Sequence, residues 1–364
     1  MKFDSSTFKF LGLTFLVFAV FTLSSLTIAT EQRAENQNPI SILENQPKDK
    51  IDDGPYIEIS KNGLNETIIE DGKVVTKELP LDRYPTKFKA EPATYKKVSK
   101  IAAFSDLHGQ YKLSINILQK NKIIDKNLNW IYGDGHLVIV GDVFDRGDKV
   151  TELLWFIFNL EGKAEKQGGK VHYLLGNHEY MIFQNDLRHI NKKYKASSEL
   201  LNTTYPELFG NNTVLGRWLR SKPTIIKIND MLFLHGGISE EFIADGFNIN
   251  RTNRQMQKSI DVDFNSAAFD SLYAKYHYDT GPIWYRGYFD KEFKKKDFEK
   301  ILKKVKAKEI IVGHTSQKKV KSYFDDQLFV VDSSIKNGEY GEILLIENGQ
   351  FERGTPKGER LDFK

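Results

Sequence analysis

The chain has 364 residues, enough for one large catalytic domain with extensions and a substantial buried core. Its 53 basic and 49 acidic residues give a formal net charge of +4, too balanced for the concentrated basic face of a nucleic-acid-binding protein. The chain contains no cysteine, so disulfides, thiolate metal sites and a cysteine-nucleophile phosphatase mechanism are excluded.

Residues 1–29 have the pattern of a signal peptide. Lys2 and Lys9 precede an uncharged, mostly apolar run from Phe10 to Thr30, which ends in small and hydroxyl residues. A retained membrane anchor is the alternative, because the run approaches the roughly 20 residues that span a bilayer. We therefore expect an exported protein, periplasmic or extracellular, that contacts a membrane only if this run is retained.

The next two segments differ in composition. Residues 30–54 are polar and rich in Asn, Gln, Lys and Asp, which predicts a disordered spacer. Residues 55–95 contain β-type runs on either side of Asp71–Gly72, and Asp-Gly between such runs is a strong hairpin signal. We expect two or three short strands packed on the main domain, followed by a linker from Pro80 to Pro92.

Three polar blocks follow three β-type runs within residues 96–355, the predicted catalytic domain. They read Ser-Asp-Leu-His-Gly at 105–109, Gly-Asp-Val-Phe-Asp-Arg-Gly at 141–147 and Gly-Asn-His-Glu at 176–179. Each block precedes a segment with a helical pattern, so we expect a β-α-β-α-β order. Ligands bind at the ends of strands in open α/β sheets, and carboxylate, imidazole and amide groups suit divalent metals.

The rest of the domain is predicted to contain further helices and strands, before a tail at 356–364. Helices are expected at 110–122, 151–166, 181–194 and 298–305, and residues 251–278 are expected to be mainly helical. Strands are expected at 98–104, 137–140 and 171–175, as a pair within 225–234, and at 310–312, 328–331 and 343–346. Residues 195–222 are predicted to be an irregular cap over the site.

Together with His235 and His314, each beside a glycine, the three blocks resemble the signature of the calcineurin-like metallophosphoesterases, in particular their phosphoprotein phosphatase branch. That signature reads GDxHG, GDxxDRG and GNHE, followed by two histidines, and Ser105 stands where its first glycine would be. The run Gly-Pro-Ile-Trp-Tyr-Arg-Gly at 281–287 is similar to the Shewanella-like protein phosphatases. The resemblance covers about residues 97–346. It implies an α/β fold with central β-sheets flanked by helices, to which the N-terminal strands would add a small β extension.

The resemblance also implies two divalent metal ions, which Mn, Fe, Zn or Co could provide. It assigns the first ion to Asp106, His108 and Asp142, and the second to Asp142, Asn177, His235 and His314. Asp142 is the predicted bridge, because two ions about 3.5–4 Å apart need one shared ligand and this residue ends the middle strand of the three. Asp106 and His108 are two residues apart after a strand, so both side chains can point the same way.

His178 is the predicted general acid, because it follows the ligand Asn177 directly and can face the substrate. Asp145 is available to hold its other ring nitrogen and fix its orientation. Arg146 and Arg286 are the predicted phosphate-binding guanidinium groups, with Asn177 beside them. A surface salt bridge is the alternative for Arg146, and packing with its aromatic neighbours for Arg286. The histidines outside the motifs are given no role: His136, His172, His189 and His277.

The expected reaction is hydrolysis of phosphotyrosine, phosphoserine or phosphothreonine in proteins. The resemblance implies direct attack by a metal-bridging hydroxide without a covalent phosphoenzyme. The alternative within the superfamily is a bis(5'-nucleosyl)-tetraphosphatase or a small-molecule phosphatase, because the Val-Gly-His-Thr run at 312–315 is also similar to the former. A catalytically inactive binding module is disfavoured, since no ligand position is missing. The expected partner is a phosphorylated protein or peptide, and not a nucleic acid.

Overall fold

The computed structural model describes residues 51–363. The predicted signal peptide or anchor at residues 1–29 lies outside the described residues, as does most of the predicted spacer at 30–54. Between residues 51 and 363, no helix combines the length and the apolar character needed to cross a bilayer.

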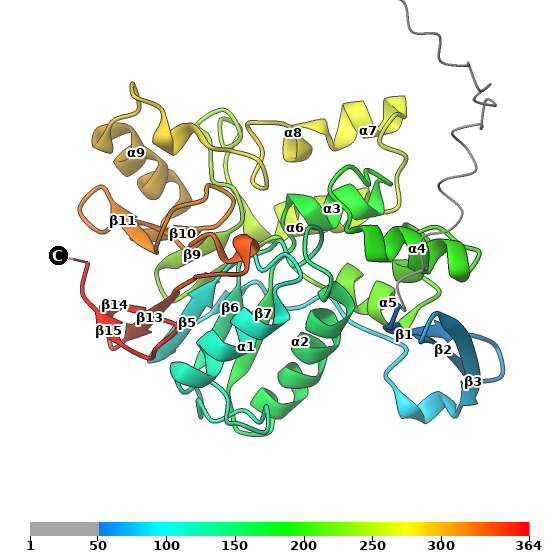
Figure 1. Cartoon of the computed structure of the whole chain (residues 1–364). Helices are drawn as coiled ribbons and strands as arrows, with labels where there is room; N and C mark the ends of the chain where they lie inside the picture. Colours follow the sequence, from blue (N-terminus) through cyan, green and yellow to red (C-terminus); the bar gives the residue numbers. More distant parts are fainter. Residues whose placement is uncertain (1–50, 364) are drawn as a thin grey trace, which may run out of the picture. The chain divides into compact units, whose positions relative to one another are not determined.

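Two six-stranded β-sheets form the centre of the domain (Figure 1). The first has the order β15-β14-β13-β5-β6-β7, with β5 Lys100–Phe104, β6 His136–Ile139, β7 Lys170–Tyr173, β13 Ile343–Glu347, β14 Gln350–Gly354 and β15 Arg360–Leu361. The second has the order β11-β12-β10-β9-β8-β4, with β4 Thr94–Tyr95, β8 Ile225–Ile228, β9 Met231–Leu234, β10 Glu309–Val312, β11 Lys321–Tyr323 and β12 Leu328–Val330. One buried apolar cluster joins Val138 of the first sheet to Phe233 of the second, so the sheets pack against each other.

Strands β5, β6 and β7 pair in parallel and carry the three polar blocks after their carboxyl ends. Helices α1 Tyr111–Lys120 and α2 Val150–Glu165 connect them. Leu137, Val138 and Ile139 of β6 are all buried, because a parallel strand is covered on both faces. The blocks therefore meet at one edge of the sheet, as the predicted β-α-β-α-β order requires.

The remaining helices follow β7 in the chain. They are α3 Asn177–Phe183, α4 Lys192–Leu200, α5 Val214–Arg220, α6 Ile249–Ser259, α7 Ala267–Leu272, α8 Ala274–His277 and α9 Lys295–Val305. The single helix predicted at 181–194 is wrong, because α3 and α4 are separate. Asn185 turns to a φ of 58° after α3, and Asn191 caps α4 by accepting the N–H of Lys193 at 3.0 Å.

Residues 195–222, predicted to be an irregular cap, instead form most of α4, a 3₁₀ turn at Pro206–Phe209 and α5. Trp218 of α5 is buried, its indole N–H donates to Glu161 of α2 at 2.8 Å, and its ring lies 5.5 Å from that of Tyr173. This segment therefore packs into the core beside α2 and β7. Its helices are too short to produce a clear period in the sequence.

Three antiparallel strands precede the large sheets: β1 Asp53–Ile59, β2 Leu64–Glu70 and β3 Lys73–Leu79. Asp71 and Gly72 join β2 to β3 with φ angles of 50° and 74°, as a two-residue hairpin turn requires. Trp155 of α2 donates its indole N–H to the carbonyl of Pro55 at 2.8 Å, and Tyr56 is buried. The small sheet therefore packs on the main domain, as predicted.

Two strands extend beyond the limits expected from the sequence. Strand β1 begins at Asp53, inside the expected spacer, where the buried Asp53 carboxylate accepts the hydroxyl of Thr151 at 3.1 Å. Strand β15 lies inside the expected tail at 356–364, where Arg360 pairs with Glu347 at 2.9 Å. Polar contacts with distant residues hold both ends, and such contacts leave no periodic signal in the sequence.

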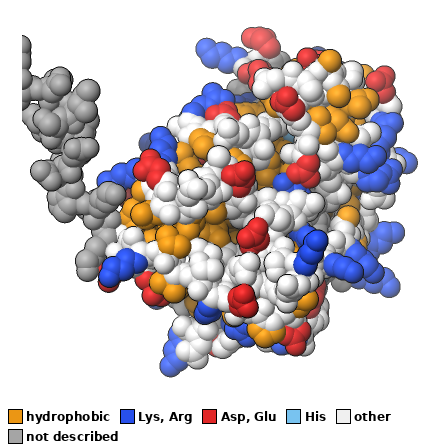
Figure 2. Space-filling model, turned by 90° about the vertical axis from the view of Figure 1, so that its right-hand side faces the viewer, with side chains coloured by type: hydrophobic (Ala, Val, Ile, Leu, Met, Phe, Trp, Pro, Cys, Tyr) orange, Lys and Arg blue, Asp and Glu red, His pale blue; other side chains and the backbone are white. Residues whose placement is uncertain are grey.

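The outer strand of the small sheet is open to solvent. Val74 and Val75 of β3 are 45 % and 43 % exposed, and the strand ends with the less exposed Leu79. Figure 2 shows this side of the molecule, where apolar patches lie between charged side chains. Charged residues on an edge strand, such as Lys73 and Lys77, discourage pairing with other chains.

Candidate active site

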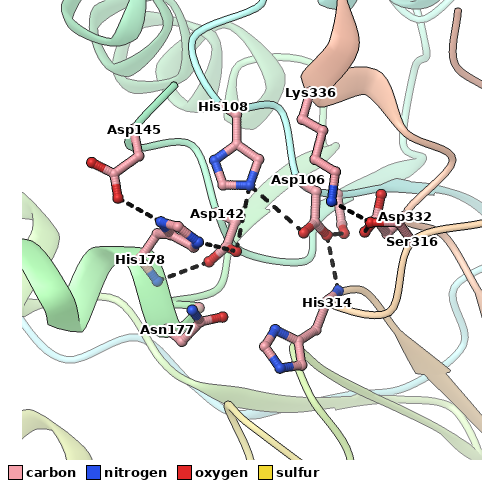
Figure 3. Close-up of polar contacts among 12 residues, drawn as sticks. Asp106, His108, Asp142, Asp145, Asn177, His178, His314, Ser316, Asp332 and Lys336 are labelled. Atoms are coloured by element: carbon pink, nitrogen blue, oxygen red, sulfur yellow. Dashed lines mark hydrogen bonds and ion pairs between the residues drawn. The ribbon is translucent and has the colours of Figure 1, made fainter. Parts of the chain in front are cut away.

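The first two polar blocks run side by side beyond the ends of β5 and β6. The N–H of Asp106 donates to Gly141 at 3.1 Å, and the N–H of His108 donates to the carbonyl of Asp142 at 3.0 Å. Gly109 and Gly147 meet so closely that a Cβ on Gly109 would lie 2.8 Å from the Gly147 backbone. Glycine is therefore required at this contact. The close approach brings the carboxylates and imidazoles of both loops into one cluster (Figure 3).

Several residues of the cluster adopt a backbone conformation that is unusual for a residue with a side chain. Positive φ angles occur at Asp106 (56°), His108 (42°), Asp142 (59°), Asp145 (71°), Arg146 (65°) and His314 (62°). Each such conformation costs on the order of 1–3 kcal/mol and persists only where the surroundings fix it. The strained residues coincide with the predicted site, as expected for side chains that are held in place for function.

Asp142 lies at the centre of the cluster. Its Oδ2 atom is 3.1 Å from Nε2 of His235, 3.7 Å from Nε2 of His108 and 3.8 Å from Nε2 of His178. Its Oδ1 atom accepts the backbone N–H of His178 at 3.0 Å. Burial raises the pKa of Asp142, but these three imidazoles outweigh burial and hold that pKa well below its usual value. Asp142 is therefore a carboxylate that faces both sides of the cluster.

Backbone carbonyl groups fix the orientation of two imidazoles. Nδ1–H of His108 donates to Phe144 at 2.6 Å, and Nδ1–H of His235 donates to Val140 at 2.7 Å. A carbonyl oxygen can only accept, so in both rings Nδ1 carries a proton and Nε2 is the nitrogen that could bind a metal ion once it is deprotonated. Both Nε2 atoms face Asp142, which is the arrangement of histidine ligands held by a second layer of hydrogen bonds.

His314 presents its other nitrogen. Its Nε2–H donates to the carbonyl of Trp284 at 3.1 Å, which leaves Nδ1 with the free lone pair. Its backbone N–H donates to Oδ2 of Asp106 at 2.9 Å. Arg286 reaches the same residue: its Nη1 donates to the His314 carbonyl at 2.5 Å, and its Nη2 lies 3.3 Å from Nδ1. The structure thus brings Arg286 and His314 together, although 28 positions separate them in sequence.

The cluster concentrates negative charge in a buried place. Burial, with the neighbouring carboxylates of Asp332 and Asp142, raises the pKa of Asp106 to about 8. Burial lowers the pKa of His235, but the carboxylates of Asp142 and Asp106 outweigh it and raise that pKa to about 10. By contrast, burial holds the pKa of His314 well below its usual value. The neighbouring carboxylates of Asp106 and Asp142, together with the neutral imidazole of His314, are groups that a bound divalent cation would stabilise.

Two groups of side chains could each hold a metal ion, and Asp142 belongs to both. The first contains His108, Asp142 and His178, and the second contains Asp142, His235 and His314, with the ligand atoms of each group within 4.8 Å of one another. Oδ1 of Asn177 lies 2.9 Å from Nε2 of His235 and so joins the second group. Oδ1 of Asp106 lies 3.9 Å from Nε2 of His108, at the edge of the first. Carboxylate, amide and imidazole donors of this kind fit divalent ions.

His178 and Asp145 form a buried pair. Nδ1 of His178 lies 2.5 Å from Oδ2 of Asp145. Burial lowers the pKa of His178, but the carboxylates of Asp142 and Asp145 outweigh burial and raise it above its usual value. Asp145 therefore holds the ring where the sequence predicted, while Nε2 faces Asp142. Because this nitrogen lies among the donor atoms, it is placed either to donate a proton or to bind a metal ion.

Arg146 is exposed at the rim of the cluster. Its backbone N–H donates to the carbonyl of His189 at 3.0 Å, and its own carbonyl accepts from Asn191 at 2.7 Å. Within residues 51–363 its side chain forms no ion pair, unlike the surface salt bridge considered as its alternative role. The Arg146 guanidinium lies close enough to His108 and His178 to lower the pKa of each, while Arg286 reaches the cluster from another loop.

Sequence reasoning missed two acidic residues next to the cluster. Glu179 is fully buried and accepts the backbone N–H groups of Asp142 at 2.9 Å, Val143 at 2.8 Å and Gly176 at 2.6 Å. Glu179 is the last residue of the third block. The sequence analysis gave its carboxylate no role, and a charged residue without a role inside a motif was the signal that could have identified it.

Asp332 is the second missed residue. It is fully buried, accepts the hydroxyl of Ser316 at 2.5 Å and lies near Asp106, with the Lys336 amine bonded to the same serine (Figure 3). It comes two residues after the end of an apolar strand, β12, much as Asp106 comes two residues after β5. This position in the sequence was the signal that could have identified it.

The four histidines given no role lie in different settings. His136 and His172 bond one another across β6 and β7 at 2.9 Å, and His277 bonds the hydroxyl of Ser259 at 2.8 Å. These three are structural. His189 differs, because its exposed ring lies 5.4 Å from the ring of His178, so the sequence alone missed a residue at the edge of the site.

A family model described as calcineurin-like phosphoesterase matches residues 99–318. A cold-active protein-tyrosine phosphatase from a psychrophilic Shewanella species has a crystal structure that is 39% identical in sequence, with a TM-score of 0.82. The match covers 86% of this chain and 99% of that one.

Two further relatives are Shewanella-like protein phosphatases. Phosphatase 1 of Plasmodium berghei is 29% identical over 65% of this chain and 67% of its own length. Phosphatase 2 of Arabidopsis thaliana is 24% identical over 67% of this chain and 73% of its own length.

Proposed function

The chain belongs to the calcineurin-like phosphoesterase family, and we propose that this phosphate-monoester hydrolase acts on phosphotyrosine in protein substrates. The family membership confirms the predicted α/β metallophosphoesterase fold and the predicted class of reaction. The observation that carries the activity is the position of Asp142, where two buried groups of metal-binding donors meet. The preference for phosphotyrosine rests on the similarity to the Shewanella tyrosine phosphatase.

Two divalent ions fit these donors. Asp106, His108 and Asp142 would hold one, and Asp142, Asn177, His235 and His314 would hold the other. Bound divalent ions supply Lewis acidity to phosphoryl oxygens and lower the pKa of water. Manganese, iron, zinc and cobalt all suit such donors, so elemental analysis of the purified protein identifies the native metal.

The chain's own residues would bind and protonate the substrate. Arg286 and Arg146 would pair with the phosphoryl oxygens, because a guanidinium group donates two parallel hydrogen bonds to such an anion. The side-chain amide of Asn177 would lie beside the phosphate. Nε2 of His178 would donate a proton to the departing oxygen, and Asp145 would keep the ring oriented through Nδ1.

The test compares kcat/KM for peptides of one sequence that carry phosphotyrosine, phosphoserine or phosphothreonine, with diadenosine tetraphosphate as a fourth substrate. The expected order places the phosphotyrosine peptide first. A higher value for diadenosine tetraphosphate would replace the proposal with the dinucleotide hydrolase that the run at 312–315 also resembles. Asp142→Asn serves as the inactive control, which excludes a contaminating phosphatase.

We also propose that residues 1–29 direct export. The basic residues and the apolar run that follows them support this proposal. Mass spectrometry of the native protein should find its N-terminus near Thr30 in an exported fraction. A membrane-bound form that retains Met1 would support the anchor instead, and a cytosolic form that retains Met1 would refute export.

A further inference from the structure

The segment between α3 and α4 places an exposed aromatic ring beside the proposed general acid. The ring centroid of His189 lies 5.4 Å from that of His178, with 44° between the ring planes. The side chain of His178 is buried, whereas His189 is exposed. His189 therefore stands on the solvent side of His178, at the rim of the cluster.

The backbone around His189 is fixed by contacts on both sides. Its carbonyl accepts the N–H of Arg146 at 3.0 Å, and the next residue, Ile190, is buried. Asn191 donates to the Arg146 carbonyl at 2.7 Å. The backbone of His189 is thus coupled to the loop that presents Arg146, the proposed phosphate-binding residue, so the main chain that carries the ring is held in place relative to the site.

The geometry of the site determines where a leaving group would lie. The phosphoryl group belongs among the buried donors around Asp142, and the proton would come from Nε2 of His178, which faces Asp142 at 3.8 Å. The carbon side of the ester must extend from there toward solvent. On the His178 side, the exposed aromatic ring next to His178 is that of His189.

The charge state of His189 suits an apolar neighbour. Partial burial, the adjacent His178 and the Arg146 guanidinium all lower the pKa of His189, which favours the neutral ring. A neutral imidazole packs on a phenyl ring through the same edge and face contacts that other aromatic pairs make. A short alkyl group, such as the side chain of serine, offers no matching surface.

We propose that His189 forms the wall on which the phenyl ring of a phosphotyrosine substrate packs, and that it therefore favours aryl over alkyl phosphate esters. This inference rests on the proposed function and deepens it, because it assigns the preference for phosphotyrosine to a named side chain. His189 acts here as a specificity-determining residue that contacts the substrate, and no chemical step passes through it.

The test compares wild type with His189→Ala and His189→Phe on phosphotyrosine and phosphoserine peptides of one sequence. Loss of one aromatic contact should lower kcat/KM for the phosphotyrosine peptide about 3- to 10-fold in His189→Ala. The phosphoserine peptide should lose less than about 2-fold, because its side chain does not reach the wall. His189→Phe should restore the phosphotyrosine value, since it restores an aromatic surface.

Controls separate packing from indirect effects. Arg188→Ala removes the exposed side chain next to His189, whose guanidinium pairs with Asp186 at 2.5 Å. This variant should leave kcat/KM for both peptides unchanged. The pH profile of kcat/KM and the inhibition constant of inorganic phosphate should match wild type in His189→Ala. A shifted pH profile on both substrates would overturn the inference, because it would mean that His189 acts through His178.

Equal losses on both peptides in His189→Ala, while wild type prefers phosphotyrosine, would also overturn the inference and leave the proposed function intact. A wild-type protein that prefers phosphoserine or hydrolyses neither peptide would instead refute the proposed function. The two failures therefore give different results.

Discussion

The carboxylate of Glu179 accepts the backbone N–H of Asp142 at 2.9 Å, so a buried charge holds the residue at the centre of the site. The same carboxylate accepts the N–H of Gly176 and the hydroxyl of Tyr173 at 2.6 and 2.8 Å. Glu179 thus connects the second block to the third through hydrogen bonds to the backbone of both. Its contacts explain how Asp142 keeps a left-handed backbone without a glycine at that position.

We expect Glu179→Gln to destabilise the fold and weaken metal binding. The new NH₂ group would face backbone N–H donors, and a buried donor without a partner costs about 1–3 kcal/mol. Loss of a group that orients a ligand typically costs 10–100-fold in metal affinity. Urea unfolding and metal titration measure the two effects. Tyr173→Phe is the control, which removes a single hydrogen bond worth about 1 kcal/mol. Wild-type stability in Glu179→Gln would contradict the role given to this carboxylate.

Asp142→Asn should lose metal from both positions. An amide oxygen is neutral and cannot bridge two cations as a carboxylate does, so affinity should fall by at least about 10²-fold, more than the loss of an orienting group causes. Elemental analysis and kcat/KM on an aryl phosphate provide the measurements. Asp134→Asn, at an exposed carboxylate near Lys100, is the matched control and should behave as wild type. Retention of both metals and full activity in Asp142→Asn would contradict the prediction that Asp142 bridges the two metal ions.

His178→Asn should separate proton donation from metal binding. If Nε2 of His178 donates a proton, metal content stays near wild type and kcat on a poor leaving group falls by about 10²–10⁴. The loss should be smaller on a nitrophenyl ester, whose oxygen departs without needing a proton. Asp145→Asn should reproduce this pattern, because it removes the partner of Nδ1.

A metal ligand would behave differently. His108→Asn, His235→Asn and His314→Asn should lose metal and lower activity on both esters alike. If His178→Asn shows that same behaviour, His178 belongs to the group of donors that also contains His108 and Asp142, and the general acid must be sought elsewhere.

Arg146→Ala and Arg286→Ala should both weaken inhibition by inorganic phosphate, by about 10- to 100-fold, because each removes a charged hydrogen bond. They should differ in metal content. Arg286 donates to the carbonyl of His314 at 2.5 Å, so its loss should also loosen His314, a proposed metal ligand. The Arg146 side chain has no such contact, so Arg146→Ala should keep its metals. Unchanged phosphate inhibition in Arg286→Ala would assign this arginine to packing with Trp284 and Tyr285.

The stability of the fold should fall as the pH drops below neutral, and His277 should contribute to the fall. Burial lowers the pKa of His277 from 6.5 to about 3. The unfolded chain therefore binds a proton between these values that the folded chain does not. One such proton changes the free energy of unfolding by about 1.4 kcal/mol per pH unit, so the contribution is complete above pH 6.5 and lost toward pH 3.

Urea unfolding from pH 7 to pH 5 checks this expectation in wild type and His277→Gln. The variant loses the hydrogen bond to Ser259, which lowers its stability at every pH, but its pH dependence should be flatter by about one proton. An identical slope in both proteins would mean that His277 is protonated in the fold, against its burial between Tyr180 and Phe269.

Local sequence signals predicted much of this architecture. The runs before 105–109, 141–147 and 176–179 predicted parallel strands, and Asp71–Gly72 predicted the hairpin of the small sheet. Such signals succeed because a buried parallel strand must be apolar throughout and a tight turn must tolerate positive φ. The break between α3 and α4 was missed, because asparagine caps compete weakly with an apolar pattern that continues across them.

The sequence by itself determined which residue types follow which strands, and thereby the candidate ligands Asp106, His108, Asp142 and Asn177. Their position could be predicted because consecutive strands joined by helices usually lie side by side and in parallel, so that the residues after them meet at one edge of the sheet. The tertiary structure alone decided how distant residues act together. It brings Arg286 to His314, buries Glu179 under Asp142, and distinguishes His189 from the three structural histidines. The physical reason is that the function of a charged or aromatic side chain depends on its neighbours, and these come from parts of the chain that only folding brings together.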